Sequence, residues 1–297
     1  MATETSNCIA CGHPVKDFWL TGCRDLYLRT PYIVNYGVCQ RCRLVQQVPI
    51  PTDPQSFYPK SYPMHHSRGK IFFLARKLMI RRVYFEPGTT ASSAVLLDFG
   101  CGDGSYLQAV HDKVGRILGF EASSEQAHLV RNQLGCDVYS NLTEAEKALQ
   151  GSVDIITAHF VLEHLTDLHA AFSFWSQILK PGGVVHLAVP NIRSGEAKMF
   201  GKYWHGLDAP RHISFPDAEC LANLSESHGF TITGSRHGIF PNTWAASLAT
   251  ILAGRYQHAL FLAFVPLSLL LSRLFPQATA VFQLQKNLLQ PAQGTDQ

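Results

Sequence analysis

The chain has 297 residues, of which 46% are hydrophobic and 16% charged, and its formal net charge is +3. This length exceeds one average domain, and the apolar fraction is large enough to bury a full core. The small net charge gives no indication of a nucleic-acid partner. Residues 1–10 contain no apolar run, so we expect no signal peptide and a cytoplasmic protein whose thiols stay reduced.

Four of the eight cysteines form two Cys-x-x-Cys pairs. These four are Cys8, Cys11, Cys39 and Cys42. Each pair places two thiolates on one tight turn, and two such turns complete the tetrahedral ligand set of a structural Zn²⁺. We therefore expect residues 1–48 to form a small zinc ribbon, with four free cysteines as the alternative. Cys23 stands outside both pairs and is expected to be packed rather than ligating.

Five prolines interrupt residues 49–69, which we expect to be a linker because proline continues neither a helix nor a central strand. Residues 70–297 are expected to form the main domain. Up to residue 242 they alternate β-branched runs with helical patterns, which predicts a parallel sheet with helices on both faces. One predicted helix is capped by Ser123 or Ser124 and ended by Gly135, and another is predicted over His164–Leu179.

A glycine-rich run, Asp98 to Gly104, follows a predicted strand and precedes a predicted helix. Glycines let the backbone approach a ligand closely, and the helix start offers free N–H groups. Glu121 ends the next strand, where a carboxylate can accept both hydroxyls of a ribose. The third glycine lies at position 104 rather than 105, which departs from the dinucleotide fingerprint. The alternative is a tight strand–helix turn without a ligand.

These residues resemble motif I of class I S-adenosylmethionine (SAM)-dependent methyltransferases. Val153 to Ile156 resembles their fourth strand, and Leu179 to Gly183 resembles the turn before their fifth strand. The resemblance implies a Rossmann-like, seven-stranded α/β sheet and SAM as cofactor. Glu121 would hold the ribose. The other positions that it places at the cofactor are Asp98, Gly100, Cys101, Gly102, Gly104, Ala122 and His159.

Histidines dominate the candidates for the acceptor side, because a base that works near neutral pH is most readily an imidazole. Glu163-His164 resembles the Leu-Glu-His run of ubiquinone-type O-methyltransferases, some of which bind a divalent metal through an added Glu. Phe160 occupies that position here, so we expect no metal there.

The run from Tyr203 to His212 combines aromatic, cationic and imidazole side chains in one loop, which suits a polar acceptor. It resembles the Pro-Arg-His loop of a methyltransferase family often encoded beside sugar and polysaccharide genes. The candidate catalytic residues are therefore His212, Arg211, His205 and His164. The alternative for each is a hydrogen bond that only fixes the loop.

The segment from Val38 to Gln46 resembles the N-terminal zinc domain of sugar C-methyltransferases, which implies a carbohydrate acceptor. Those enzymes carry a Tyr-His-Glu-His catalytic run where this chain has Ala209-Pro210-Arg211-His212. We expect methyl transfer to a sugar, glycolipid or related small molecule, with oxygen as the acceptor atom and carbon or nitrogen as alternatives. The alternatives are an RNA methyltransferase that grips RNA through its zinc module, and a non-catalytic SAM-binding protein.

Residues 243–275 are apolar and almost uncharged. Tyr256–Ser272 contains no Asp, Glu, Lys or Arg, but its length is at the lower limit for a bilayer span and Pro266 interrupts it. We expect a helical insertion between the last two strands, which lies on the inner face of the membrane as a peripheral anchor or covers the acceptor pocket as a lid. Residues 70–85 read as a basic amphipathic helix, either a second surface anchor or a first helix packed on the sheet.

Overall fold

The computed structural model describes residues 6–58, 92–238, 242–275 and 277–288. The predicted first helix over residues 70–85 and the second half of the linker lie outside the described residues. The remaining linker residues include a short 3-10 helix, η1 (Pro54–Phe57).

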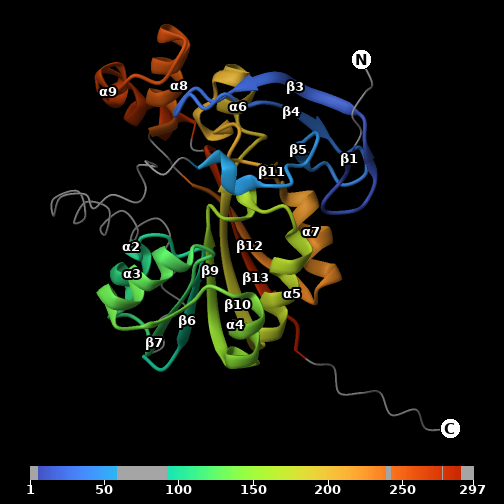
Figure 1. The fold of residues 1–297 in the computed structure, drawn as a ribbon, viewed down its shortest axis with the longest axis vertical. Helices are drawn as coiled ribbons and strands as arrows, with labels where there is room; N and C mark the ends of the chain where they lie inside the picture. Colours follow the sequence, from blue (N-terminus) through green and yellow to red (C-terminus); the bar gives the residue numbers. More distant parts are fainter. Residues whose placement is uncertain (1–5, 59–91, 239–241, 276, 289–297) are drawn as a thin grey trace.

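A seven-stranded sheet forms the centre of the main domain (Figure 1). Its strands, in spatial order, are β12 (Phe230–Gly238), β13 (Thr279–Lys286), β10 (Leu179–Pro190), β9 (Val153–His159), β6 (Val95–Phe99), β7 (Arg116–Phe120) and β8 (Asp137–Tyr139). β13 runs antiparallel to β10 and β12, whereas the other neighbours are parallel. This is the Rossmann-like methyltransferase sheet that the sequence predicts.

Helices cover both faces of this sheet. One face packs against α2 (Ser105–Val110) and α3 (Ser124–Leu134), and the other packs against α4 (Leu142–Leu149), α5 (Leu168–Ile178) and α7 (Ala218–Ser227). Because neighbouring residues of a strand point to opposite faces, Leu96 belongs to the first apolar cluster and Leu97 to the second.

Local signals set several helix boundaries. The predicted cap at Ser123 is confirmed, since its hydroxyl accepts from the N–H of Gln126, and Gly135 ends α3 in a left-handed conformation. A cap of this kind contributes about 1 kcal/mol. The predicted helix start at His164 is wrong, because Leu162–His164 forms a 3-10 turn and α5 begins after Asp167, whose carboxylate caps it.

The predicted turn before the fifth strand is instead part of β10. The strand already begins at Leu179, where it pairs with Val153. The next pair joins Val184 to Ile155, so the Pro-Gly-Gly sequence forms an irregularity between the two pairs.

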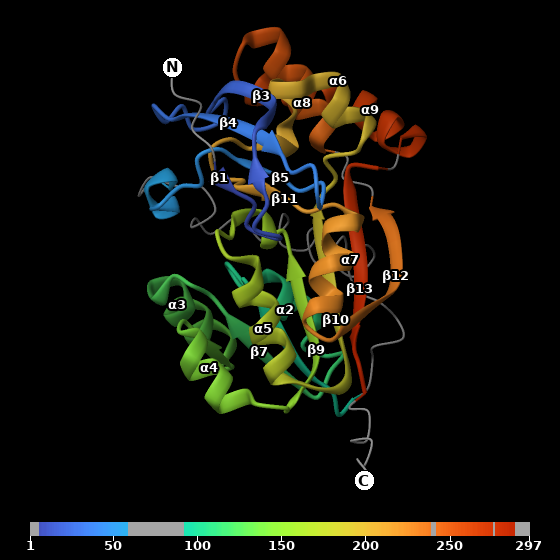
Figure 2. The ribbon, with the colours of Figure 1, turned by 90° about the vertical axis from the view of Figure 1, so that its right-hand side faces the viewer.

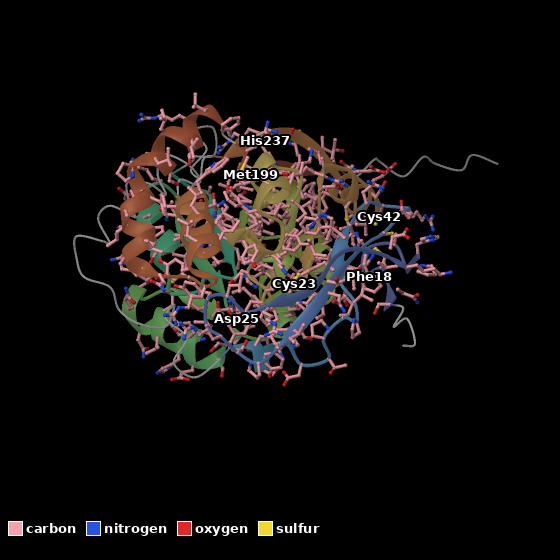
Figure 3. The ribbon with its side chains drawn as sticks, turned by 90° about the horizontal axis from the view of Figure 1, so that it is seen from above. Phe18, Cys23, Asp25, Cys42, Met199 and His237 are labelled. Carbon is pink, nitrogen blue, oxygen red and sulfur yellow. The ribbon has the colours of Figure 1, made fainter. Side chains whose placement is uncertain are left out.

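A smaller sheet lies above the carboxyl ends of the central strands (Figures 1 and 2). It consists of β11 (Ser214–Phe215), β5 (Val45–Gln47), β4 (Ile33–Val38) and β3 (Asp17–Arg24), and a separate hairpin joins β1 (Ser6–Asn7) to β2 (Pro14–Val15). The N-terminal ribbon therefore shares a sheet with residues of the main domain. Cys42 lies at one end of the ribbon, and Cys23 and Asp25 lie toward the other (Figure 3).

The apolar stretch forms two packed helices between β12 and β13, α8 (Asn242–Ala253) and α9 (His258–Leu274). They lie beside the smaller sheet and α6 (Gly195–Phe200), as Figure 2 shows. No helix in the described ranges is long and apolar enough to cross a membrane.

Candidate functional site

The glycine-rich run forms an open ledge at the end of β6. Gly102 has a positive φ of 52°, and no atom lies within 4 Å of the position that a Cβ would occupy there. Glu121, at the end of β7, accepts hydrogen bonds from the N–H groups of Gly102 (3.0 Å) and Ser123 (3.1 Å). These bonds fix a half-buried carboxylate beside the ledge, which is the arrangement that binds a ribose next to a close backbone approach.

Other residues of the glycine-rich run form contacts with neighbouring strands and loops of the protein. The Asp98 carboxylate accepts a buried 2.7 Å hydrogen bond from the Thr157 hydroxyl. The Cys101 thiol lies against Gly119, and burial raises its pKa. A Cβ at Gly100 would come within 2.6 Å of the Val161 side chain, so only glycine fits at this position without a shift of its neighbour.

The remaining cofactor candidates flank the ledge. Ala122 is exposed next to Glu121. The His159 ring, at the end of β9, lies 4.8 Å from the ring of Tyr106, and burial lowers the pKa of this imidazole to about 3. An open ledge, a positioned carboxylate and an exposed small residue together fit a nucleoside cofactor, as the sequence predicts for SAM.

His164 and His212 meet at the centre of the acceptor side. Their ring centroids are 4.7 Å apart, although 48 positions separate them in the sequence. His164 Nδ1 lies 2.9 Å from the Tyr58 hydroxyl and 3.1 Å from the Arg211 carbonyl oxygen. The pair therefore joins the loop after β9 to the acceptor loop.

The tautomer of His212 follows from its hydrogen bond. Its Nδ1 lies 2.9 Å from the Gly206 carbonyl oxygen, which can only accept, so Nδ1 carries the proton and Nε2 has the free lone pair. Burial, with His164 nearby, lowers the pKa of His212 to about 3. Nε2 lies 4.0 Å from the Asp208 carboxylate, which can stabilise an imidazolium once it forms.

Glu163 is buried beside this pair, and neither of its carboxyl oxygens has a hydrogen-bond partner among the described residues. Burial raises its pKa to about 8. Ligand-type atoms of Glu163, His164 and His212 all lie within 4.8 Å of one another, a spacing that could also hold a metal ion. The three residues therefore form a cluster that can exchange a proton or hold a metal ion.

Arg211 is fully buried between two carboxylates. Its guanidinium donates to Asp25 at 2.7 and 3.1 Å and to Asp208 at 2.6 and 3.0 Å. Although burial opposes ionisation, these Arg211 bonds bring the pKa of Asp208 down to about 2. A guanidinium engaged in this way cannot also bind an acceptor, so we expect Arg211 to position Asp208 and the loop.

The ribbon holds the rest of this loop. The Gln47 amide donates to the carbonyl oxygens of Pro210 (2.6 Å) and His212 (3.0 Å). The Tyr36 hydroxyl also donates to the His212 carbonyl oxygen, at 2.8 Å. Directly after the loop, β11 pairs with β5. The N-terminal ribbon therefore determines where His212 lies.

His205 lies apart from the His164–His212 pair. Its ring is 6.2 Å from the rings of both Tyr27 and Tyr256, and it lines a pocket between the ribbon and α8. The structure therefore brings His164 to the acceptor loop beside His212 and places His205 at a separate pocket.

The paired cysteines converge at the end of the ribbon. Cys8 Sγ lies 3.4 Å from Cys42 Sγ, Cys11 Sγ lies 3.5 Å from Cys39 Sγ, and all four sulfur atoms lie within 4.8 Å of one another. Four thiolates around a zinc ion, at the usual Zn–S length, are about 3.8 Å apart.

The two cysteine turns share one geometry. In the first, the Gly12 N–H donates to the Cys8 carbonyl oxygen; in the second, the Arg43 N–H donates to the Cys39 carbonyl oxygen. Gly12 and Arg43 both have positive φ. The residues present therefore fit a tetrahedral metal site, whereas Cys23 is buried in a separate apolar cluster.

Sequence reasoning missed the residues that hold the acceptor loop. These are Asp25, Tyr36, Gln47, Tyr58 and Asp208. Four of them lie more than 100 positions from their partners, so no local pattern reveals them. Asp208 stands three positions before Arg211, and this spacing is the one signal that could have indicated the pair.

The sheet order is that of the Rossmann-like methyltransferase fold. A model of the methyltransferase domain matches residues 73–234, which is more than half of the chain. The chain therefore belongs to the methyltransferase domain family, and SAM is the cofactor that this membership supports.

Relatives of the chain agree with this assignment. The chain is 26% identical to a probable S-adenosylmethionine-dependent methyltransferase of Mycolicibacterium smegmatis over 204 residues, 66% of this chain and 76% of that protein. It is 31% identical to the ubiquinone biosynthesis O-methyltransferase of Brucella anthropi over 101 residues, 32% of this chain and 41% of that protein. The chain thus spans less than half of the second relative.

The fold itself resembles solved methyltransferases. A SAM-dependent methyltransferase from Archaeoglobus fulgidus aligns with a TM-score of 0.50 at 18% identity, covering 72% of this chain and 94% of that one. At this identity the likeness concerns the fold alone.

Proposed function

We propose that this methyltransferase transfers a methyl group from SAM to an oxygen atom of a small polar acceptor, a sugar, glycolipid or related metabolite. The observation that carries the proposal is the His164–His212 pair, in which His212 keeps a free Nε2 lone pair beside Asp208. The name of the Brucella relative supports oxygen as the acceptor atom. The acceptor class rests on the resemblance of the ribbon and the acceptor loop to sugar-modifying enzymes.

When bound, SAM supplies a methyl group on a sulfonium that leaves as a neutral thioether. The ledge at Gly102 and the Glu121 carboxylate would hold the nucleoside. His212 Nε2 would take the proton that the acceptor hydroxyl loses as its oxygen bonds to the methyl carbon. Asp208, held by Arg211, would stabilise the resulting imidazolium.

We also propose that the four paired cysteines bind one structural Zn²⁺. The sulfur distances and the matched turns support this site. Because the ribbon positions the acceptor loop through Gln47 and Tyr36, the zinc would act on catalysis indirectly, by keeping the ribbon folded.

We further propose that the α8–α9 hairpin contacts the membrane surface peripherally. Eight large apolar side chains of the hairpin and its end are exposed, and the described part of the hairpin contains no Asp or Glu. They are Ile251, Leu252, Leu262, Leu267, Leu269, Leu270, Leu274 and Phe275. An exposed apolar surface of this kind usually marks an interaction site.

Methyl-labelled SAM and fractionated cell extract test the proposed reaction. Label should enter the sugar or lipid fraction, and His212→Ala should lower kcat by about 10²–10⁴-fold while SAM binds normally. The exposed His111, at the end of α2, provides a matched control, since His111→Ala should change neither. Label in RNA would establish the RNA methyltransferase instead, and SAM binding without labelled product would establish a non-catalytic protein.

A further inference from the structure

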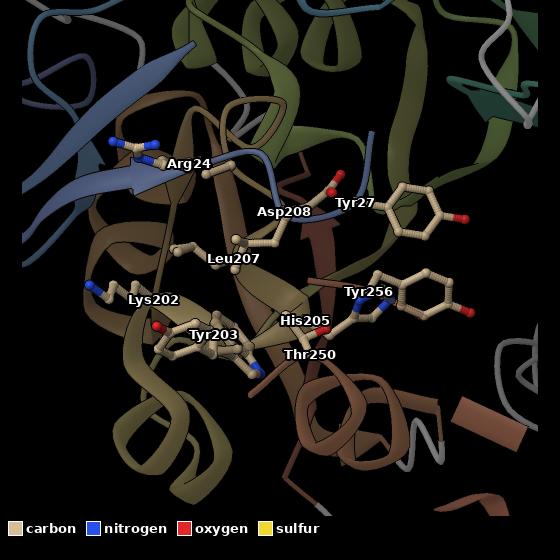
Figure 4. Close-up of a pocket in the computed structure, with 12 residues that line it drawn as sticks. Arg24, Tyr27, Lys202, Tyr203, His205, Leu207, Asp208, Thr250 and Tyr256 are labelled. Atoms are coloured by element: carbon tan, nitrogen blue, oxygen red, sulfur yellow. The ribbon is translucent and has the colours of Figure 1, made fainter. Parts of the chain in front are cut away.

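A pocket lies where the ribbon, the acceptor loop and the α8–α9 hairpin meet (Figure 4). Arg24 at the end of β3, Lys202 in the 3-10 turn η5 (Gly201–Tyr203), Tyr27 and Tyr256 are among its lining residues. Three segments that are distant in the sequence therefore contribute to one cavity.

The pocket carries a net positive charge. Arg24 and Lys202 are both exposed, and neither forms an ion pair with a carboxylate in the described part of the chain. The single acidic side chain that lines the pocket, Asp208, is already paired with Arg211. Two unpaired cations therefore line a cavity that has one carboxylate, and the cavity keeps a net positive charge.

Aromatic side chains also line the cavity. The rings of Tyr27 and Tyr256 are 4.9 Å apart, and the His205 ring stacks on Tyr256 at 6.2 Å. The backbone N–H of Tyr256 donates to the Leu26 carbonyl oxygen at 2.9 Å, which ties the hairpin to the ribbon. Figure 4 shows the cationic ends of Arg24 and Lys202 on one side and the two tyrosine rings on the other.

We propose that this pocket binds a phosphate monoester at one end of the acceptor. A phosphate monoester carries close to two negative charges at neutral pH and offers three acceptor oxygens, so it can pair with both cations at once. Arginine suits phosphate oxygens because its fork donates two hydrogen bonds. The tyrosine rings would cover the ring or chain attached to the phosphate. This inference rests on the proposed function and gives its acceptor a chemical class.

One side chain, Asp208, lies between the pocket and the proposed base. Asp208 lines the pocket, and its Oδ2 lies 4.0 Å from Nε2 of His212. A phosphate between Arg24 and Lys202 would therefore hold the acceptor without occupying the space around His212. We expect the phosphate to contribute to binding, and hence to KM more than to kcat.

Titration calorimetry with glucose 1-phosphate and with glucose tests the pocket in the full chain. Glucose 1-phosphate should bind, and R24Q combined with K202Q should weaken its binding by about tenfold or more. K113Q combined with K147Q is the matched control, because it removes two exposed positive charges elsewhere. Equal weakening by both double variants, equal binding of glucose, or no binding of glucose 1-phosphate would each overturn the proposal.

A second experiment distinguishes a lipid phosphate from a soluble one. Phosphatidylcholine vesicles with and without phosphatidic acid, a lipid phosphomonoester, are sedimented with the wild type and both double variants. Binding that depends on phosphatidic acid and is lost only in R24Q/K202Q identifies a lipid-linked acceptor. Binding of glucose 1-phosphate alone identifies a soluble one.

Neither binding measurement needs SAM or turnover. The results therefore distinguish an error in the phosphate site from an error in the proposed function. If the chain binds glucose 1-phosphate but transfers no methyl group, the phosphate site is supported and the proposed methyl transfer is contradicted. If R24Q/K202Q transfers methyl groups with the KM of the wild type, the phosphate site is contradicted and the proposed methyl transfer is supported.

Discussion

The guanidinium of Arg211 and the carboxylate of Asp25, 186 residues apart in the sequence, form an ion pair whose two side chains are completely shielded from solvent. One partner follows β3 of the ribbon and the other lies in the acceptor loop. The pair therefore joins the proposed zinc module to the proposed catalytic histidine.

Removing one partner of this pair should destabilise the protein strongly. Asp25→Ala should lower the free energy of unfolding by about 3–5 kcal/mol, because it leaves a buried guanidinium with one carboxylate instead of two. Denaturant titration measures the change. Asp17 is the control, since it is exposed on β3, and Asp17→Ala should cost under about 1 kcal/mol. If both variants lower the free energy of unfolding equally, the buried Arg211–Asp25 pair contributes no more to stability than an exposed carboxylate.

The cofactor half of the site could be predicted from the sequence because its signals are local. A buried strand, a glycine turn and a helix follow one another between Val95 and Val110, and Glu121 ends the next strand. The acceptor half depends on contacts between distant segments. Nothing near Tyr36 or Gln47 indicates that their side chains bind the loop around His212.

Glu121→Ala should weaken SAM binding by about 1–3 kcal/mol, the range for hydrogen bonds to a charged group. The carboxylate lies beside the Gly102 ledge, where a ribose would be held. Titration calorimetry measures the loss. Glu125→Ala removes an exposed carboxylate from the first turn of α3 and should leave SAM affinity unchanged. Unchanged affinity in Glu121→Ala would remove this residue from the site.

Purified protein should contain one zinc ion per chain. Cys39→Ala should lose the metal, whereas Cys23→Ala should keep it, because Cys23 lies outside the cluster of four sulfur atoms. Elemental analysis of both variants checks this. Chelation should also unfold the ribbon and abolish methyl transfer, since the ribbon positions the acceptor loop. A metal-free chain with an intact ribbon contradicts the zinc assignment.

Glu163 should make stability depend on pH. Its pKa is raised to about 8 in the folded protein, so the folded state binds the proton more tightly than the unfolded state. The stabilisation is complete below the unfolded pKa of about 4.5 and is lost as pH rises through about 8. Glu163→Gln, which resembles the neutral carboxyl group but does not titrate, should remove this loss.

The quantity to measure is the difference in the free energy of unfolding between wild type and Glu163→Gln at each pH. The wild-type curve alone is not enough, because the neutral buried histidines make stability rise with pH below about pH 6.5. Urea unfolding at several pH values between 5 and 8 gives both curves. Glu144→Gln, at an exposed position on α4, should run parallel to the wild type. If the curve for Glu163→Gln is also parallel to the wild type, Glu163 does not hold a proton in the folded protein.

The α8–α9 hairpin should determine whether the protein binds vesicles. Replacing residues 245–274 by a short Gly-Ser bridge should keep SAM binding, because the cofactor ledge lies on β6, α2 and β7, and it should abolish flotation with anionic liposomes. A milder variant changes Leu262 and Leu269 to Ser. These leucines are 56% and 48% exposed and lie on one side of α9, so their replacement should reduce flotation without unfolding the helix.

Substitution of Leu129 and Ile33 by Ser is the matched control, because both are exposed apolar residues outside the hairpin, on α3 and β4. Transfer of a leucine side chain out of water is worth about 1.5–3 kcal/mol when burial is complete, so two leucines can change the bound fraction by more than tenfold. The control should float like the wild type. If the intact protein never floats with lipid, the hairpin is a lid over the acceptor pocket, and its exposed leucines have another role.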